Sequence, residues 1–304
     1  MRATFVDCLI ERARKDERIF GITPDMGFSV LEKFRDEFPD RFLNVGVAEQ
    51  DAIGIAAGLA LTGKVVYVYS IIPFLTMRCY EHIRLDVAYM NLNVRLVGVG
   101  AGLTYGPSGP THHSIEDIAI MRALPNMTVC CPGDPIEVRE LINHSFDFEG
   151  PMYFRLGKSG EKTIHPEGTK IRIGEAINVR DGKDLCLITT SNTLAWAVQL
   201  SQALANKGVA TGVISMPTIK PLDAKAITSI VEKGTPIVTL EEHNIIGGLG
   251  SAVAEVIAEH GQRTRFMRKG IPDRFVSQIG DQEYLRKVLH IADVDELAQF
   301  ARGT

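Results

Sequence analysis

Residues 44–70 read NVGVAEQDAIGIAAGLALTGKVVYVYS, and this stretch decides the fold of the chain. The part from 46 to 63 is rich in glycine and alanine, which favours a helix whose Gly54 and Gly58 let a neighbouring backbone approach closely. KVVYVYS (64–70) is a continuous apolar run, typical of a strand buried on both faces of a sheet. A helix that leads straight into a buried strand belongs to a βαβ unit, so the stretch predicts a parallel sheet.

Further helices and strands alternate on both sides of this stretch. Before it we expect an amphipathic helix with Phe5, Leu9 and Ala13 on its apolar face. A strand over 18–23, a helix over 29–38 and a strand over 42–46 follow. After the stretch the pattern predicts helices over 73–90, 115–124 and 135–146, and strands over 93–100, 127–132 and 152–157. This alternation indicates an α/β fold.

A polar segment divides the chain. GKSGEKTIHPEGTK (157–170) contains glycine and proline and lacks any period, as linkers do. Beyond it the alternation resumes with apolar runs such as LCLITT (185–190) and PIVTLEE (236–242). We therefore predict two domains, 1–160 and 173–304, joined by a linker at 161–172. Each domain should be a mostly parallel sheet flanked by helices.

The composition argues against several classes of protein. Lysine plus arginine (33) and aspartate plus glutamate (37) nearly balance among 304 residues, and no long basic run is present, so nucleic acid is not an expected partner. The first 20 residues mix charges with apolar residues, and no stretch reaches the length of a membrane span. The five cysteines are odd in number and lack metal-site spacing. We expect a cytoplasmic protein with buried, reduced thiols and no metal ligands of its own.

An irregular loop, AGLTYGPSGPTHHS (101–114), interrupts the alternation of helices and strands. Its glycines and prolines mean that the backbone conformation is specified residue by residue. Long ordered loops in compact domains are often functional, so we expect functional side chains in this loop.

Several motifs in order along the chain resemble the pyrimidine-binding and C-terminal domains of the transketolase family. These motifs are NVGVAEQ (44–50), YSIIPFL (69–75), GPTHHSIEDIAIMR (109–122), YFRLGK (153–158) and EEHNIIGGLG (241–250). The resemblance runs over nearly the whole chain. It implies a transferase that uses thiamine diphosphate.

The resemblance implies a pyrimidine pocket built around Glu49. A largely buried carboxyl group at this position hydrogen-bonds a ring nitrogen of the cofactor and so activates it. The start of a helix also favours a carboxylate there. Phe74 matches the aromatic residue that packs on the pyrimidine ring, and Tyr80 matches an aromatic residue beside it. Met77 stands where many transketolases carry a second phenylalanine, and its sulfur can still cover a ring face.

The resemblance also implies substrate contacts. His112 matches a histidine that hydrogen-bonds the hydroxyl or carbonyl group of the donor, whereas His113 stands where glutamine is common. Ser108 stands where sugar transketolases place an aspartate that contacts the donor's second hydroxyl, so the choice of substrate is open. Arg155 matches an arginine for sugar phosphate. For HNIIGGLG (243–250) we favour a tight packing turn over an anion site.

The diphosphate-binding half of the family lacks a counterpart in this sequence. That half carries Gly-Asp-Gly and a later asparagine, and the nearest match here, Arg180-Asp181-Gly182, lacks the first glycine and the asparagine. The resemblance therefore implies an N-terminal transketolase subunit as partner, which holds the diphosphate and a Mg²⁺ or Ca²⁺ ion. Cofactor sites of this family lie between chains, so it implies an α2β2 heterotetramer with a β–β contact.

The leading hypothesis is a subunit that helps to move a two-carbon ketol unit from a ketose to an aldose, either of which can be phosphorylated. One alternative is the β subunit of the decarboxylating component of a 2-oxo-acid dehydrogenase. A second is an enzyme like deoxyxylulose-phosphate synthase, which shares the Gly-Pro-Thr-His loop. A third is a scaffold or regulatory subunit without activity, although Glu49, Phe74 and His112 argue against it.

Overall fold

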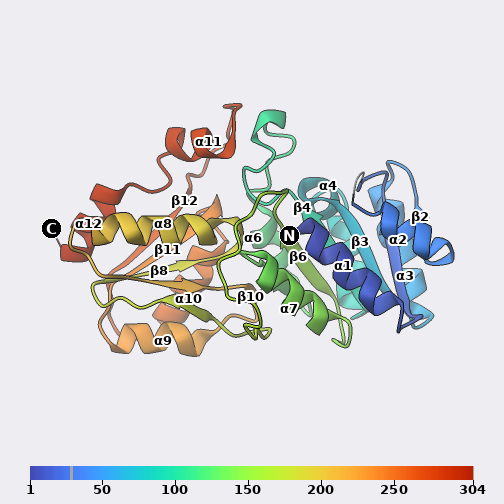
Figure 1. Cartoon of the computed structure of the whole chain (residues 1–304), viewed down its shortest axis with the longest axis horizontal. Helices are drawn as coiled ribbons and strands as arrows, with labels where there is room; N and C mark the ends of the chain where they lie inside the picture. Colours follow the sequence, from blue (N-terminus) through green and yellow to red (C-terminus); the bar gives the residue numbers. More distant parts are fainter. Residues whose placement is uncertain (28–29, 304) are drawn as a thin grey trace.

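The computed structural model describes residues 1–27 and 30–303 of the chain. Two sheets lie side by side along the long axis of the molecule (Figure 1), and helices cover both faces of each. The N-terminal half builds most of one sheet, and the C-terminal half builds the other. The predicted α/β class with two mostly parallel sheets is confirmed.

The first sheet has the strand order β10-β5-β6-β4-β3-β1-β2. Its neighbouring strands are parallel, except that β10 from the C-terminal half pairs antiparallel with β5. The sheet of the first half therefore takes an edge strand from the second half. The strands are β1 (Ile19–Thr23), β2 (Phe42–Asn44), β3 (Val65–Ile71), β4 (Val94–Val99), β5 (Thr128–Cys130), β6 (Met152–Leu156) and β10 (Thr218–Lys220).

Alternation along β3 assigns the two faces of this sheet, because successive side chains of a strand point to opposite faces. Val66 and Val68 pack with α3 and the π-helix η2 in one core cluster. Tyr67 and Tyr69 pack with α1 and α7 in another. The helices of this half are α1 (Arg2–Ala13), α2 (Glu32–Glu37), α3 (Glu49–Leu61), α4 (Ile72–Thr76), α5 (Tyr80–His82), η2 (Ile83–Tyr89), α6 (Asp117–Ala123) and α7 (Pro135–Ser145), with 3₁₀ turns η1 (Pro39–Arg41) and η3 (Gly106–Ser108).

Two predicted helices differ from those observed. The helix expected over 73–90 is divided into α4, α5 and η2, and the division falls at Met77–Cys79. A π-helix is rare and often accompanies a functional site. The helix expected over 29–38 is observed only as α2; the predicted first residue, Ser29, lies outside the described residues.

The second sheet has the order β12-β11-β8-β9-β7, parallel except for the β7–β9 pair. Helices α8 and α12 cover one face, and α9 and α10 cover the other. The sequence patterns did not predict β7, β10, α9, α11 or α12. The elements are β7 (Ile177–Arg180), β8 (Leu185–Thr189), η4 (Ser191–Thr193), α8 (Leu194–Ala205), β9 (Thr211–Ser215), α9 (Ala224–Glu232), β11 (Ile237–Asn244), α10 (Leu249–His260), β12 (Phe266–Ile271), α11 (Gln282–Val288) and α12 (Val294–Arg302).

The segment predicted as a linker is anchored to α7. Asp134 Oδ2 accepts hydrogen bonds from the backbone N–H groups of Ile164 and His165, both at 2.8 Å. The imidazole of His165 is buried and bonds Glu137 through its Nε2 at 2.7 Å. The polar residues of the predicted linker therefore include some that make specific buried contacts. The exact limits of the two domains remain our proposal.

Two simpler expectations concern cysteines and membranes. All five cysteines are buried and free, and burial raises the pKa of the Cys8 thiol to about 11, so it stays protonated at neutral pH. Within residues 1–27 and 30–303, no helix has the length and apolar character needed to cross a bilayer.

Candidate active site

The candidate residues gather at one edge of the first sheet, where the parallel strands end. Glu49 follows β2, Phe74 follows β3, the loop with His112 follows β4, and Lys158 follows β6. In open α/β sheets the crevice outside the carboxyl ends of the strands is where ligands bind. The topology therefore brings together residues that are more than 100 positions apart.

Glu49 is the first residue of α3, and only 3% of it is exposed. Its Oε2 accepts a hydrogen bond from Arg78 Nη1 at 2.6 Å. Arg78 is half-exposed, so one partner of this ion pair lies in the sheet edge and the other reaches solvent. Burial, with a smaller contribution from the Glu49 charge, raises the pKa of the neighbouring Cys79 thiol to about 12. The Cys79 thiol therefore stays protonated at neutral pH beside Glu49.

Phe74 and Arg78 are four residues apart, and the guanidinium of Arg78 lies over the Phe74 ring, 4.9 Å from its centroid. The same guanidinium bonds Glu49. A planar, positively charged group thus contacts an aromatic face and a buried carboxylate at once. A flat heterocycle with a hydrogen-bonding nitrogen could make the same pair of contacts.

His112 lies edge-on against Phe74, with ring centroids 5.2 Å apart and planes at 73°. Its Nδ1 is hydrogen-bonded with Thr111 Oγ1 at 2.9 Å, which holds the ring in place. Tyr105 flanks it on another side, with centroids 6.0 Å apart. Within the described part of the chain Nε2 has no hydrogen-bond partner, so it is available to a ligand.

Lys158 also contacts Tyr105. Its Nζ lies 4.7 Å from the centroid of the Tyr105 ring, as in a cation–π contact. Ser108 is exposed in the turn η3, where its backbone N–H donates to Tyr105 O at 2.8 Å. A positive charge thus lies over the Tyr105 ring, and Ser108 is exposed three residues after Tyr105.

Three other predicted residues are not placed against the Phe74 ring by any observed contact. His113 is 3% exposed, neither of its ring nitrogens makes a well-formed hydrogen bond with the described residues, and burial lowers its pKa, which favours the neutral ring. Tyr80 donates its hydroxyl to Ile120 O at 3.0 Å. Met77 is partly exposed directly after α4. Their predicted roles stay predictions.

Arg155 lies inside the protein, where it bridges the two halves. Nε donates to Asp117 Oδ2 at 2.8 Å, Nη1 to Ser191 Oγ at 3.1 Å, and Nη2 to the carbonyl oxygens of Ser114 and Glu242 at 2.7 and 3.0 Å. Only 1% of the residue is exposed. Each of its three nitrogens already bonds a protein atom, so the predicted contact with a sugar phosphate would require this network to open.

The glycine-rich turn HNIIGGLG (243–250) contains a carboxylate of its own. Glu241 accepts the backbone N–H groups of Leu249 and Gly250 at 2.7 and 2.8 Å, at the start of α10. Any side chain at Gly248 would collide with Glu241 and His243. The geometry favours the packing turn over an anion site, because the protein's carboxylate already occupies the helix N-terminus.

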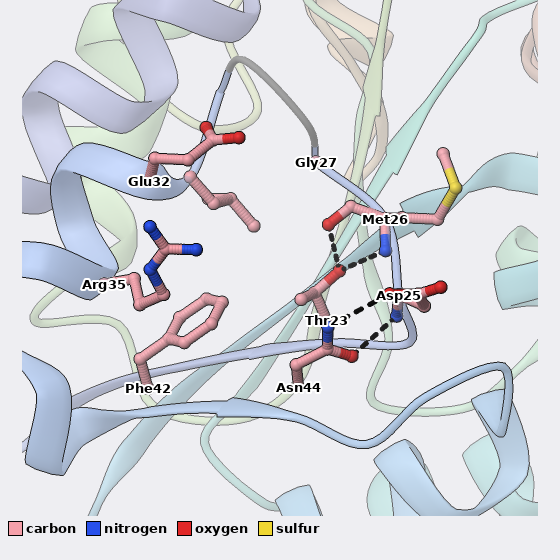
Figure 2. A pocket seen from close by; sticks show the side chains of 9 residues that line it. Thr23, Asp25, Met26, Gly27, Glu32, Arg35, Phe42 and Asn44 are labelled. Atoms are coloured by element: carbon pink, nitrogen blue, oxygen red, sulfur yellow. Dashed lines mark hydrogen bonds between the residues drawn. The ribbon is translucent and has the colours of Figure 1, made fainter.

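A cavity of about 90 Å³ opens at the ends of β1 and β2, on the same edge as Glu49. Figure 2 shows its wall: Thr23 and Asn44 hold the turn at Asp25 and Met26 through hydrogen bonds, and Arg35 faces them across the opening. The cavity is too small to enclose a molecule of cofactor size. The cavity lies at the carboxyl ends of the strands, like Glu49, and does not form a closed pocket.

Arg78, Tyr105 and Lys158 were not among the residues predicted for the site. A signal for two of them was present in the sequence. Arg78 lies four residues after Phe74, the spacing that stacks side chains on a helix. Lys158 lies two residues beyond the carboxyl end of β6. Tyr105 has no such signal, because its place depends on the path of the loop.

The residues fit the aminopyrimidine of thiamine diphosphate, since a buried carboxylate and an aromatic face lie within reach of one planar group. A diphosphate needs a metal ion or several cations, and the described residues hold no cluster of three or more His, Cys, Asp or Glu side chains suited to a metal. The residues around Glu49 and Phe74 therefore fit the aminopyrimidine part of the cofactor.

Family models and known relatives match most of the chain. Residues 1–161 match the transketolase pyrimidine-binding domain, and residues 174–291 match the transketolase C-terminal domain. A subunit of the apulose-4-phosphate transketolase of Actinobacillus succinogenes is 40% identical over 89% of this chain and 87% of its own. A putative transketolase C-terminal section of Methanocaldococcus jannaschii is 41% identical over 90% and 87%. The 1-deoxy-D-xylulose-5-phosphate synthase of Aquifex aeolicus is 36% identical over 95% of this chain but only 46% of its own.

Among solved structures, a split-gene transketolase described as an inactive β4 tetramer superposes with a TM-score of 0.88 at 31% identity. The match covers 99% of this chain and 96% of the other. Both domains, in the same order and at nearly full length, are thus shared with these relatives, and the chain belongs to the transketolase family.

Proposed function

We propose that this chain is the pyrimidine-binding subunit of a two-chain, thiamine-diphosphate-dependent transketolase. The pair would transfer a two-carbon ketol unit from a ketose or its phosphate to an aldose or its phosphate. The observation that carries this proposal is the buried carboxylate of Glu49 at the sheet edge, beside the Phe74 ring. Two relatives matched over most of their length are named as a transketolase subunit and as a C-terminal section, which supports the division into two chains.

Each side chain has a defined task in this proposal. Glu49 hydrogen-bonds a pyrimidine nitrogen, and Phe74 packs against the ring. Thiamine diphosphate, when bound, supplies the carbon nucleophile that accepts the ketol unit. His112 presents Nε2 to a hydroxyl or carbonyl oxygen of the donor, since Thr111 orients the ring through Nδ1. Ser108, exposed in the same loop, and Lys158, over the Tyr105 ring, are proposed to contact the remaining hydroxyl groups or a phosphate.

The outer face of α3 is proposed to bind the partner that carries the diphosphate and the Mg²⁺ or Ca²⁺ ion. A side chain added at Gly54 or Gly58 would meet no described atom within 4 Å, so the close neighbour expected from these glycines is not found within the described residues. The exposed apolar residues of α3 and of the adjoining η2 segment are Ile55, Leu61, Leu85, Tyr89 and Met90. Because α3 begins at Glu49, a chain bound here would close the cofactor site.

We propose two copies of each chain in the active assembly. The split-gene relative is described as an inactive tetramer of β chains. This description supports contact between two copies of the present chain and the need for a second kind of chain. An isolated preparation of this protein should accordingly be inactive.

The second candidate function is that of a deoxyxylulose-phosphate-synthase-like enzyme. It is favoured by the Aquifex aeolicus relative and by the shared loop around His112. Pyruvate as donor separates the candidates, because that synthase reaction releases carbon dioxide whereas ketol transfer does not. Release of carbon dioxide from pyruvate, with no turnover of ketoses, would favour the second candidate.

The test uses this chain reconstituted with its diphosphate-binding partner. Glu49→Gln should lower kcat by about 100-fold or more, because general acid–base assistance commonly contributes that much. Glu259→Gln is the matched control, since Glu259 is an exposed glutamate on α10, outside the candidate site and the α3 face, and should leave kcat unchanged. Full turnover of ketose donors by Glu49→Gln would sink the proposal.

A further inference from the structure

The loop that carries His112 has both of its ends in the core of the C-terminal domain. Leu103 and Ile115 are buried in one cluster with side chains of the second half such as Leu240 and Leu285. The backbone N–H of Ser114 donates to Gly102 O at 3.0 Å, which closes the loop between these two residues. The loop leaves the first sheet but packs as part of the second domain.

Glu242 on β11 is the centre of the contact. Its Oε2 accepts hydrogen bonds from the backbone N–H of Leu103 at 3.0 Å, from Asn192 Nδ2 at 2.9 Å and from Gln282 Nε2 at 2.8 Å. Oε1 bonds Arg286 Nε. Only 1% of Glu242 is exposed. Hydrogen bonds to a buried charge are the stronger kind, so this carboxylate anchors the first end of the loop firmly.

Further bonds anchor both ends of the loop to the C-terminal domain. Asn192 Nδ2, besides its bond to Glu242, donates to Ala101 O at 3.0 Å. The backbone N–H of Asn244 donates to Ile115 O at 2.8 Å. Arg155 bonds the carbonyl oxygens of Ser114 and Glu242 with a single nitrogen. The second end is thus held by β11 directly and through Arg155.

The tip of the loop touches the segment before α11. Figure 1 shows the loop and the α11 segment projecting together beyond the two sheets. A Cβ at Gly106 would collide with the carbonyl oxygen of Gly280 and with Leu285, so no larger residue fits there without displacing the loop. His112 lies six residues after Gly106, and its backbone N–H donates to Gly109 O at 3.0 Å.

We infer that the C-terminal domain positions the substrate loop, and that Glu242 is the positioning residue. The inference rests on the proposed function for the role of His112, whereas the anchoring itself is a property of this chain. Glu242 touches neither Glu49 nor Phe74 in any observed contact and acts through Leu103 and the loop. A small displacement of His112 is enough to slow catalysis, because rates fall steeply when a positioned group moves by about 1 Å.

Glu242→Gln tests the inference against Glu241→Gln. Glu241 is the adjacent residue, is equally buried, and caps α10 without contacting the loop. Hydrogen–deuterium exchange on the chain alone should show the amides of residues 101–113 exchanging about tenfold faster in Glu242→Gln, because a charged acceptor for Leu103 N–H is lost. Glu241→Gln should leave the exchange of this loop as in the wild type.

Kinetics of the reconstituted pair supply the second readout. Glu242→Gln should lower kcat by about 100-fold while the KM for thiamine diphosphate stays within about threefold, since Glu49 and Phe74 remain in place. Unchanged loop exchange and unchanged kcat in Glu242→Gln would overturn the inference. If the wild-type pair lacks transketolase activity, the proposed function fails, but the exchange experiment still decides whether the loop is anchored.

Gly106→Ala covers the case in which Glu242→Gln does not fold. The substitution leaves the buried carboxylate intact and pushes the tip of the loop away from Gly280. We expect faster exchange of residues 105–113 and a loss of kcat in the same direction. Wild-type exchange and wild-type kcat in a folded Gly106→Ala protein would also overturn the inference.

Discussion

Arg78 makes both of the contacts that an aminopyrimidine ring would need from this chain. Its guanidinium bonds Glu49 and covers the face of Phe74. It must therefore leave at least one of these two residues before a ring can occupy both. Arg78 is half-exposed, so it can move toward solvent without being buried unpaired.

The substitution Arg78→Ala should change binding and stability in opposite directions. In the reconstituted pair, removal of the competing guanidinium should lower the Kd for thiamine diphosphate by about fivefold. This corresponds to about 1 kcal/mol, the size expected for a partly exposed ion pair. In urea, the free chain should lose a similar free energy of unfolding because Glu49 loses its partner. Titration calorimetry and chemical denaturation measure the two effects. Weaker cofactor binding would show that Arg78 assists the ring.

At the scale of single elements, α3 carries both of the roles proposed above, the cofactor contact and the partner-binding face. The first residue of α3 is Glu49. Gly54 and Gly58 lie on its outer face, where the diphosphate-binding partner is proposed to bind. The face toward the sheet is apolar and buried, so the helix stays folded without a partner. The same short element can thus couple assembly to the cofactor site.

Gly58→Leu should block assembly without harming the free chain. The added side chain meets no described atom, and replacing a helical glycine stabilises a helix by about 0.5–1 kcal/mol. Thermal denaturation of the free chain should therefore show equal or higher stability, whereas size-exclusion chromatography with the partner should show loss of the complex. Normal complex formation by Gly58→Leu would place the partner on another surface.

The segment around His165 has a pH-dependent anchor. Burial lowers the pKa of His165, but its hydrogen bond and charge interaction with Glu137 outweigh burial, so the pKa lies above its ordinary value of 6.5. The folded state therefore binds this proton more tightly than the unfolded state does. The stabilisation is fully present below the unfolded pKa of 6.5 and is lost as the pH rises through the folded pKa.

His165→Gln should consequently reduce the free energy of unfolding more at pH 6 than at pH 9. Urea denaturation at both pH values measures the difference. Ile164→Val is a control at the neighbouring position, because it removes a methylene group and should have a similar effect at each pH. If His165→Gln lowered the free energy of unfolding equally at both pH values, protonation of His165 would not be the source of the stabilisation.

At the scale of the whole molecule, the two halves share structure. β10 from the second half completes the first sheet, and Leu103 and Ile115 from the first half lie in the core of the second. A single apolar cluster also runs through both halves, from Val66 on β3 to Ile188 on β8. The two halves of this chain are thus joined through a shared sheet and shared apolar clusters.

A fragment of residues 1–172 should not fold as the intact chain does. It would expose Leu103 and Ile115 and leave β5 as an unpaired edge. We expect a single unfolding transition for the intact chain by circular dichroism, and a broad, weakly cooperative one for the fragment. A fragment as stable as the whole chain would show that the halves fold independently.

Local patterns in the sequence were enough to determine much of the fold. The alternation of buried strands and helices identified β1, β3, β4, β6, β8 and β11, because the period of apolar residues is set by the backbone. Motif resemblance identified Glu49, Phe74 and His112, which the fold brings to one edge. The apolar period along the chain could not identify β10, a strand of three residues that forms by pairing with β5.

The tertiary structure alone decided which partners each side chain has. Arg155 looks from its strand position like a ligand for phosphate, yet it bonds Asp117, 38 residues away, and the Glu242 carbonyl, 87 residues away. The contact of Arg78 with Glu49 and the hold of Glu242 on Leu103 likewise join separate parts of the chain, 29 and 139 residues apart. Periodicity reports the neighbours of a residue along the chain. Its neighbours in space follow from the order of the strands and the path of the loops between them.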